Sequence, residues 1–145
     1  MNKLDEFTKQ FTDKPIDNVV KIKREYFQVE EEILNKIKDT NKEIFSVGLF
    51  LGEEKDYFKP SLALIDLLSK KSEKKAYINK KGEWLFLCKR TILEGNIVKS
   101  NISQGMVLVQ NEKDENLGYG SIQRQGRQII LKPILDRGDF LRREK

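Results

Sequence analysis

The first part of the chain alternates between helix-like and strand-like hydrophobic patterns. Leu4, Phe7 and Phe11 recur at the spacing of a helix with one apolar face, which predicts a helix over residues 4–12. Two short β-type runs follow. A second helical pattern begins at Glu30, with acidic residues in its first turn. The order predicted for residues 1–44 is therefore helix, strand, strand and helix, with the strands at 18–23 and 26–29.

The next stretch is more apolar and leads to a candidate domain boundary. Residues 44–51 (IFSVGLFL) are apolar at almost every position, which predicts a strand buried on both faces. Gly52 is expected to open a charged loop, and Pro60 is expected at the first position of a helix, where proline is favoured. The polar run 70–75 (KKSEKK) then predicts a boundary that divides the chain into domains 1–73 and 74–145.

Beyond this boundary the pattern changes to short β-type runs separated by turn residues. Such a series of short strands is typical of a small barrel. The predicted fold class is therefore α+β, with an N-terminal α/β domain packed on a C-terminal β pseudo-barrel. The expected strands are residues 76–78, 91–98, 106–110, 117–123 and 128–135, with a helical turn at 82–87.

Positive charge is distributed unevenly along the chain. Lysine and arginine number 12 against 14 acidic residues in residues 1–70, but 16 against 9 in residues 71–145. The planar guanidinium fork of arginine suits phosphate groups, so this distribution favours nucleic-acid binding by the C-terminal part. A solvated charged surface is the alternative interpretation. Five of the seven arginines lie in the last 22 residues: Arg124, Arg127, Arg137, Arg142 and Arg143.

The composition excludes several classes of site. The chain has no histidine and a single cysteine, Cys88, so it lacks Ser-His-Asp chemistry, imidazole metal ligands and internal disulfides. We therefore expect no enzyme activity, no catalytic residue, no cofactor and no metal. No apolar run reaches the length of a membrane span, and no apolar signal segment opens the chain. These features predict a cytoplasmic protein, or a nuclear or nucleolar one in a eukaryote.

A few single residues and one short motif have competing interpretations. In LGYG (117–120), the glycines indicate either a close approach to a ligand or a barrel-corner kink, and the kink is favoured. Tyr77, Trp84 and Phe86 have rings suited to base stacking, but large aromatic residues in a small barrel are more typical of its core. Cys88 is expected to be a small buried hydrophobic residue.

A set of segments occurs in the order seen in one known family. The segments are VGLFLG (47–52), the apolar series from Phe58 to Leu68, Gly82-Glu83 followed by Phe86-Leu87, Ile92-Leu93, GMVLVQN (105–111), LGYG (117–120) and DRGDFLRRE (136–144). From about Phe45 to its end, the chain resembles large-subunit ribosome-biogenesis proteins of archaea and eukaryotes. Those proteins join a pre-PUA domain to a PUA domain, the RNA-binding fold named for pseudouridine synthases and archaeosine transglycosylases.

The resemblance implies a pre-PUA-like domain at 1–73 and a PUA-like RNA-binding domain at 74–145. It implies a non-enzymatic factor in large ribosomal subunit biogenesis and pre-rRNA processing. The expected partners are pre-rRNA, single-stranded or U-rich, and ribosome-assembly proteins, with no membrane and no small-molecule substrate. The alternatives are an accessory subunit of an RNA-modification enzyme and a protein–protein adaptor. The lysine-rich, histidine-free composition favours an archaeal source.

The same resemblance implies which residues contact RNA. It indicates Arg142 and Arg143 most directly and Lys145 less so, whereas Arg124, Arg127 and Arg137 are candidates on charge alone. Lys89 stands where the family usually has a glycine that lets RNA approach the backbone. Either the approach differs here, or the lysine contacts a phosphate directly.

Overall fold

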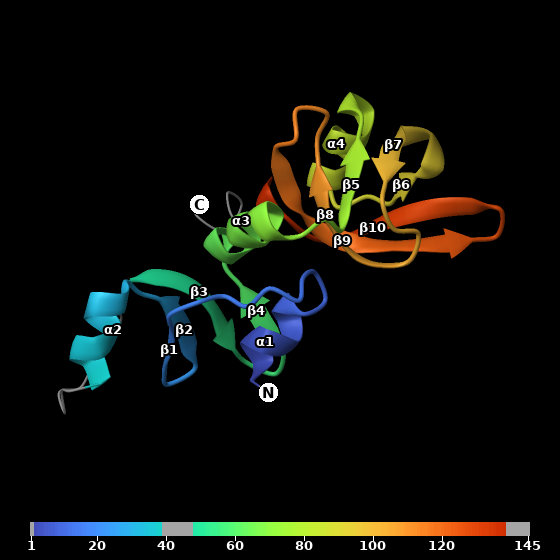
Figure 1. The fold of residues 1–145 in the computed structure, drawn as a ribbon. Helices are drawn as coiled ribbons and strands as arrows, with labels where there is room; N and C mark the ends of the chain where they lie inside the picture. Colours follow the sequence, from blue (N-terminus) through green and yellow to red (C-terminus); the bar gives the residue numbers. More distant parts are fainter. Residues whose placement is uncertain (1, 39–47, 139–145) are drawn as a thin grey trace.

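The computed structural model describes residues 2–38 and 48–138, which form two halves joined end to end (Figure 1). The N-terminal half, residues 2–38 and 48–71, contains a four-stranded antiparallel sheet in the order β1-β2-β3-β4. Its elements are α1 (Lys3–Thr8), β1 (Val19–Ile22), β2 (Glu25–Gln28), α2 (Glu31–Lys38), β3 (Leu49–Glu54), β4 (Phe58–Pro60) and α3 (Leu62–Lys71).

The C-terminal half, residues 75–138, is a six-stranded sheet in the order β6-β10-β9-β8-β5-β7. All of its strand pairs are antiparallel except the parallel pair β5–β8. The sheet curves into a nearly closed barrel, which confirms the prediction of a small barrel (Figure 1). Its elements are β5 (Lys75–Ile78), α4 (Lys80–Leu87), β6 (Ile92–Leu93), β7 (Ile97–Ser100), β8 (Gly105–Gln110), β9 (Asn116–Gln125) and β10 (Gln128–Asp136).

The prediction of a strand buried on both faces at residues 44–51 is wrong in its described part, and residues 44–47 lie outside the described residues. β3 begins at Leu49, and the side chains of Leu49 and Phe50 are 44% and 38% exposed. Leu51, the next residue, is fully buried. The pairing of β2 with β3 contains a bulge at this point, which breaks the regular alternation of faces. Of the three described apolar residues Leu49, Phe50 and Leu51, only Leu51 therefore enters the core.

Two further boundaries differ from expectation. Gly52 lies inside β3 rather than at the start of a loop, because it pairs with Tyr26 of β2 and with Pro60 of β4. Pro60 ends β4 instead of starting a helix. The helix α3 begins after Ser61, whose hydroxyl oxygen accepts a hydrogen bond from the backbone N–H of Leu64 at 3.1 Å. This serine is the N-cap, which satisfies a donor that the first helical turn would leave unpaired.

The single strand predicted at 91–98 is also wrong, because a 3₁₀ turn at Glu94–Asn96 divides it into β6 and β7. β6 pairs with β10 on one side of the barrel, whereas β7 pairs with β5 on the other. The turn therefore allows the chain to pass between the two ends of the sheet and brings the barrel close to closure.

Two buried clusters form the core. One lies entirely within the C-terminal half and consists of Ala76, Ile78, Phe86, Ile92, Val107, Val109, Leu117, Ile122 and Leu131. The other joins residues of both halves: Leu4, Phe7, Phe11, Tyr26, Leu51, Leu64, Ile65 and Leu68 from the N-terminal half, with Leu108 and Tyr119 from the barrel. We call this second group the shared core.

The shared core fixes how the two halves meet. The Tyr119 ring packs edge-on against Phe7 and Phe11, with ring centroids 5.4 and 5.7 Å apart. Residues 72–74 connect α3 to β5, and the buried Ser72 hydroxyl donates a hydrogen bond of 2.6 Å to the Phe11 carbonyl oxygen. The connection is therefore short and bonded to the opposite half, so it is not a free linker.

Candidate nucleic-acid interface

The structure places two of the predicted RNA-binding arginines together. Arg124 and Arg127 lie at the tip of the β9–β10 hairpin, and both are exposed. The hairpin extends away from the N-terminal half (Figure 1). Its position holds two guanidinium groups in solvent, where phosphates are accessible to them. Arg142, Arg143 and Lys145 lie outside the described residues.

Within the described part of the chain, the side chain of Arg137 is bonded to other residues of the protein, unlike the two hairpin arginines. Its Nε donates to the backbone oxygen of Asn116, and its Nη2 donates to the carboxylate of Asp66 on α3. The same Nη2 lies 3.3 Å from Oδ1 of Asn116. The side chain of Arg137 therefore links the end of β10 and the start of β9 to the N-terminal half. We call this group of three residues the Arg137 clamp.

Lys89 stands at a position where the backbone adopts a positive φ. It follows α4 with a φ of 62°, in the left-handed region that favours glycine. The N–H of Lys89 bonds to the Phe86 oxygen and the N–H of Arg90 to the Leu85 oxygen, at 3.0 and 2.9 Å. This pair of bonds is the Schellman arrangement that ends many helices with glycine. A glycine at this position therefore has a helix-capping reason that is independent of RNA.

The LGYG segment is part of the protein interior. A Cβ added at Gly118 would lie 1.9 Å from the Leu135 backbone oxygen, and one at Gly120 would lie 2.5 Å from the Lys132 oxygen. The glycines therefore allow β9 to approach β10 closely, next to a register shift in their pairing. Tyr119, between them, is 7% exposed, and burial raises its pKa to about 12. The favoured interpretation, a kink in the barrel, agrees with this geometry.

The candidate stacking residues differ in exposure. Phe86 is fully buried, as predicted for a core aromatic, but Trp84 is 60% exposed, which contradicts that prediction. Cys88 is also exposed, so the expectation of a buried thiol is wrong. The reason is helical geometry: Gly82 and Phe86, four residues apart, face the barrel, whereas Trp84 lies between them on the outer side of α4.

Tyr77 lines a hollow of about 420 Å³ together with two lysines, Lys75 and Lys99, the acidic Glu73 and three small or polar residues; we call it the Tyr77 hollow. The ammonium group of Lys99 lies 4.7 Å from the centre of the Tyr77 ring, a cation–π distance. Burial, and then a hydrogen bond to the Asp114 carboxylate, raises the pKa of Tyr77. Hydrogen bonds from Gln110 and then from Tyr77 lower the pKa of Asp114. The hollow thus combines a neutral, half-buried ring with two lysines and one glutamate.

Sequence reasoning missed Lys75 and Lys99 as members of this site. Lys75 and Tyr77 are two residues apart on β5, so they share a face of the strand. Lys99 stands opposite Tyr77 in the β5–β7 register. The two-residue spacing was visible in the sequence, but the pairing of β5 with β7 was not, because a helix and another strand separate them along the chain.

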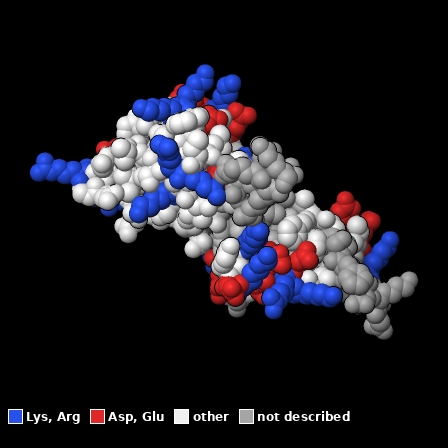
Figure 2. All heavy atoms as spheres, turned by 180° about the vertical axis from the view of Figure 1, so that it is seen from behind, with Lys and Arg blue, Asp and Glu red and all other residues white. Residues whose placement is uncertain are grey.

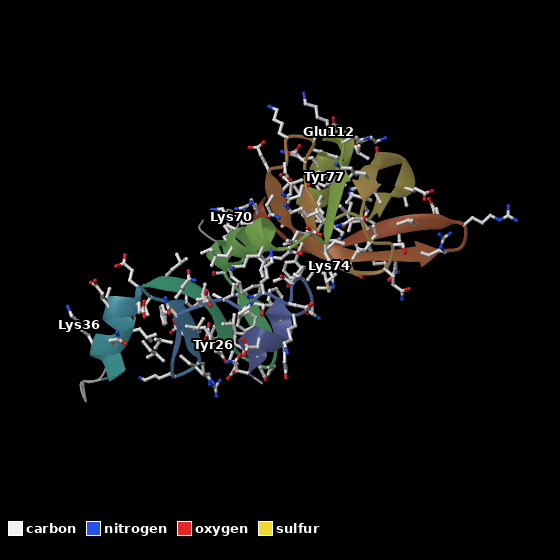
Figure 3. All side chains as sticks on the ribbon, in the orientation of Figure 1. Tyr26, Lys36, Lys70, Lys74, Tyr77 and Glu112 are labelled. Atoms are coloured by element: carbon white, nitrogen blue, oxygen red, sulfur yellow. The ribbon has the colours of Figure 1, made fainter. Side chains whose placement is uncertain are left out.

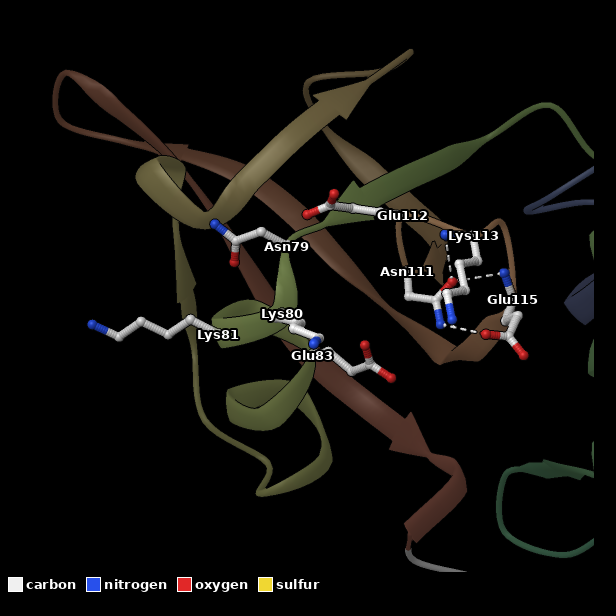
Figure 4. A pocket seen from close by; sticks show the side chains of 8 residues that line it. All are labelled: Asn79, Lys80, Lys81, Glu83, Asn111, Glu112, Lys113 and Glu115. Atoms are coloured by element: carbon white, nitrogen blue, oxygen red, sulfur yellow. Dashed lines mark hydrogen bonds between the residues drawn. The ribbon is translucent and has the colours of Figure 1, made fainter.

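A different hollow, of about 600 Å³, lies between the start of α4 and the β8–β9 turn (Figure 4). Asn111 holds the turn: its Oδ1 accepts hydrogen bonds from the N–H groups of Lys113 and Glu115, both at 2.9 Å. The lining contains three lysines and three glutamates. Because these charges balance, the site has no evident preference for a polyanion, and we do not assign RNA binding to it.

Basic side chains are spread over the back of the C-terminal half (Figure 2). The acidic side chains there gather mainly at one edge, whereas over the N-terminal half acidic and basic side chains lie next to each other. This distribution agrees with the charge count of the sequence. Among residues 2–38 and 48–138, no helix has the length and apolar character needed to span a membrane.

One comparison with known proteins matches the C-terminal part of the chain, and two others match most of its length. Residues 74–145 match the model of the UPF0113 PUA domain family. A UPF0113 protein of Archaeoglobus fulgidus is 27% identical over 133 residues, which span 85% of this chain and 75% of that protein. The solved structure of a conserved PUA domain protein from Thermoplasma acidophilum aligns with 99% of this chain and 96% of its own, with a TM-score of 0.57 and 15% identity. The C-terminal half therefore has the fold of a PUA domain, a fold that generally binds RNA.

Proposed function

We propose that this protein is a non-enzymatic RNA-binding factor in large ribosomal subunit biogenesis. In this proposal the PUA domain binds pre-rRNA and the N-terminal half, as a pre-PUA-like domain, binds assembly proteins. The observation that carries the proposal is the PUA domain itself, which occupies the part of the chain where basic residues outnumber acidic ones 16 to 9. An RNA backbone is the polyanion that such a domain is suited to bind.

Two described features support RNA as the ligand. The hairpin tip exposes Arg124 and Arg127, whose planar groups make paired hydrogen bonds to phosphate oxygens. The Tyr77 hollow offers an aromatic ring beside Lys99. Stacking of unpaired bases on aromatic rings, combined with cationic contacts to phosphates, is a common way to bind single-stranded RNA.

The non-enzymatic part of the proposal is supported by the sequence, which has no histidine to move a proton near neutral pH. The assignment to ribosome biogenesis is supported by the ordered segments that begin at about Phe45 and continue to the end of the chain.

RNA titration of the full chain tests the proposal. We expect tighter binding to U-rich single-stranded RNA than to duplex RNA or single-stranded DNA, with affinity that falls steeply between about 50 and 200 mM salt. Replacing Arg124 and Arg127 with Glu should weaken binding roughly tenfold and flatten the salt dependence. The matched control replaces Arg24 and Lys36 with Glu, which makes the same charge change on exposed sites of the N-terminal half. Figure 3 labels Lys36 at the end of the molecule far from the barrel.

Two results would contradict the proposal. Absence of RNA binding by the full chain would reject RNA as the ligand and favour the adaptor interpretation. Equal binding to fragments of the large-subunit and small-subunit rRNA precursors would reject the assignment to the large subunit. In that second case the RNA-binding function itself would stand.

A further inference from the structure

A second hollow adjoins the Tyr77 hollow at the junction of the two halves. The second hollow has a volume of about 450 Å³ and is lined by the turn after α1, the end of α3 and the connection to β5. Glu73 and Asn101 line both hollows, so the two lie next to each other. We call the combined feature the junction groove. Figure 3 shows Lys74 where the two halves meet and Tyr77 farther along β5.

The junction groove has an excess of positive charge. Its acidic lining residues are Asp13 and Glu73, while Asp114 lies 4.0 Å from the ammonium group of Lys75. Within the described ranges of the chain, no carboxylate forms an ion pair with Lys9, Lys14 or Lys71. The lining contains six lysines in all: Lys9, Lys14, Lys71, Lys74, Lys75 and Lys99.

The walls of the groove are fixed by hydrogen bonds between the halves. The buried Ser72 hydroxyl donates to the Phe11 oxygen, and the Lys74 ammonium group donates to the Gln10 oxygen at 3.2 Å. At the other end, the Lys75 N–H donates to Oδ1 of Asn101 at 2.9 Å. A ligand therefore meets a groove whose shape is already formed, which reduces the entropy cost of binding.

Two features of the groove point to single-stranded RNA. Lysines along a groove are suited to following a sugar–phosphate backbone, since each ammonium group can approach a different phosphate. The ring of Tyr77, at the barrel end, is suited to stacking on a base, and only an unpaired base exposes its face in this way. The lysines and the ring line these two adjoining hollows.

We propose that a single RNA strand lies in the junction groove, and that Lys9 and Lys14 of the N-terminal half bind its phosphates. This inference rests on the proposed RNA-binding function and extends it, because the N-terminal half then takes part in RNA binding. The sequence placed RNA contacts in the C-terminal part alone. The structure brings these two lysines into the groove because the shared core holds the turn after α1 against the connection between the halves.

The experiment uses the full chain in which Lys9 and Lys14 are both replaced with Glu. Its matched control is the variant with Arg24 and Lys36 replaced with Glu, which has the same net charge. Binding to U-rich single-stranded RNA is measured by fluorescence anisotropy at several salt concentrations. We expect the groove variant to bind roughly tenfold more weakly than the control, and its salt slope to fall by about 0.7 for each phosphate that the protein no longer neutralises.

Two further variants test for a folding defect and for stacking on Tyr77. Replacing Lys9 and Lys14 with Gln removes the charges without adding acidic groups, and circular dichroism verifies the fold. The Gln variant should show a smaller loss of affinity in the same direction. Replacing Tyr77 with Leu should weaken binding to single-stranded RNA more than binding to duplex RNA, because only unpaired bases stack on the ring.

The outcomes separate this inference from the proposed function. If the wild-type chain binds RNA and the Lys9/Lys14 variants bind as tightly as the control, the inference is wrong while the RNA-binding function stands. If the wild-type chain binds no RNA, the proposed function itself fails. If the Lys9/Lys14 variants lose affinity for an acidic protein instead of RNA, the groove is a protein-binding site and the inference is likewise wrong.

Discussion

The two halves of the molecule differ in how they complete their cores. The barrel has one buried cluster formed entirely by its own residues. The described part of the N-terminal half forms its main cluster only with the help of Leu108 and Tyr119, which the barrel contributes. The dependence is therefore unequal: the N-terminal half needs the barrel to complete its core, whereas the barrel has a second core of its own. Phe7 and Phe11 are therefore buried only when the barrel, which comes later in the chain, has folded.

Replacement of Tyr119 with Ala should break this relationship most severely. The change leaves a cavity beside Phe7 and Phe11, and truncating a buried aromatic residue costs about 3–5 kcal/mol. Because the cavity lies in the shared core, the N-terminal half should unfold before the barrel. Denaturant unfolding followed by hydrogen exchange measures the order of the two events. Tyr119→Phe is the control that keeps the ring. A single cooperative loss of both halves would show that the dependence is mutual.

Alkaline pH should have the next largest effect. The pKa of Tyr119 is raised to about 12 in the folded protein, so the fold favours its neutral form. This contribution to the free energy of unfolding is complete below pH ~10, the pKa of an unfolded tyrosine, and is lost as the pH rises from there to about 12. The loss should reach about 2–3 kcal/mol.

The matched variant isolates this residue from the other tyrosines. Burial also raises the pKa values of Tyr26 and Tyr77, so those groups act in the same direction in both proteins. The measurement is the difference in unfolding free energy between wild type and Tyr119→Phe at pH values on either side of this range. If that difference stays constant, the tyrosine hydroxyl is not the group responsible.

Substitutions in the Arg137 clamp test a contact between the halves that lies outside the shared core. Arg137→Ala removes the hydrogen bond to the Asn116 backbone and the ion pair with Asp66, so we expect a loss of about 1–2 kcal/mol. Asp66→Asn removes only the charge on the partner and should cost less than about 1 kcal/mol. A double-mutant cycle measures their coupling. The same Arg137→Ala protein also tests the prediction that Arg137 binds RNA: unchanged RNA affinity would make it a structural residue alone.

Lys89→Gly should give the smallest change, and it should stabilise the protein. The residue has a positive φ, which costs a lysine more than a glycine, although glycine gains entropy in the unfolded chain. We expect a net gain of about 0.5–1 kcal/mol, measured as a higher thermal midpoint. Lys89→Ala loses the same charge but keeps the strain, so it should not stabilise. Equal loss of RNA affinity in both variants would confirm a phosphate contact; an equal thermal shift would contradict the strain argument.

Local signals explain which elements the sequence predicts well. α1, α4 and the β9–β10 hairpin follow from spacings and turn residues within about ten positions. The errors arise where a distant partner decides the outcome. Leu49 and Phe50 are exposed because of a bulge against β2, and Trp84 is exposed because the barrel takes the opposite face of a short helix.

In the candidate site, contacts between residues far apart in the sequence limit prediction even more strongly. Arg137 looks like a phosphate-binding arginine in sequence, yet its partner Asp66 lies 71 residues away. The lysines of the junction groove are individually ordinary, and only the contact between Ser72 and Phe11, 61 residues apart, brings their segments together. Charge counts correctly show where basic residues are in excess, but they do not show which of them face a common groove.

The short connection at residues 72–74 has a consequence for multivalent binding. Ser72 is buried and bonded to the opposite half, so the junction groove and the hairpin arginines are held at one separation. If both surfaces bind one RNA, as proposed above, their fixed separation makes binding depend on the length of the RNA. A ligand long enough to span both meets the second site at a high effective concentration, whereas a shorter one gains nothing from it. The affinity for a polymer should therefore rise abruptly at one length instead of gradually, and that length reports the distance between the two surfaces.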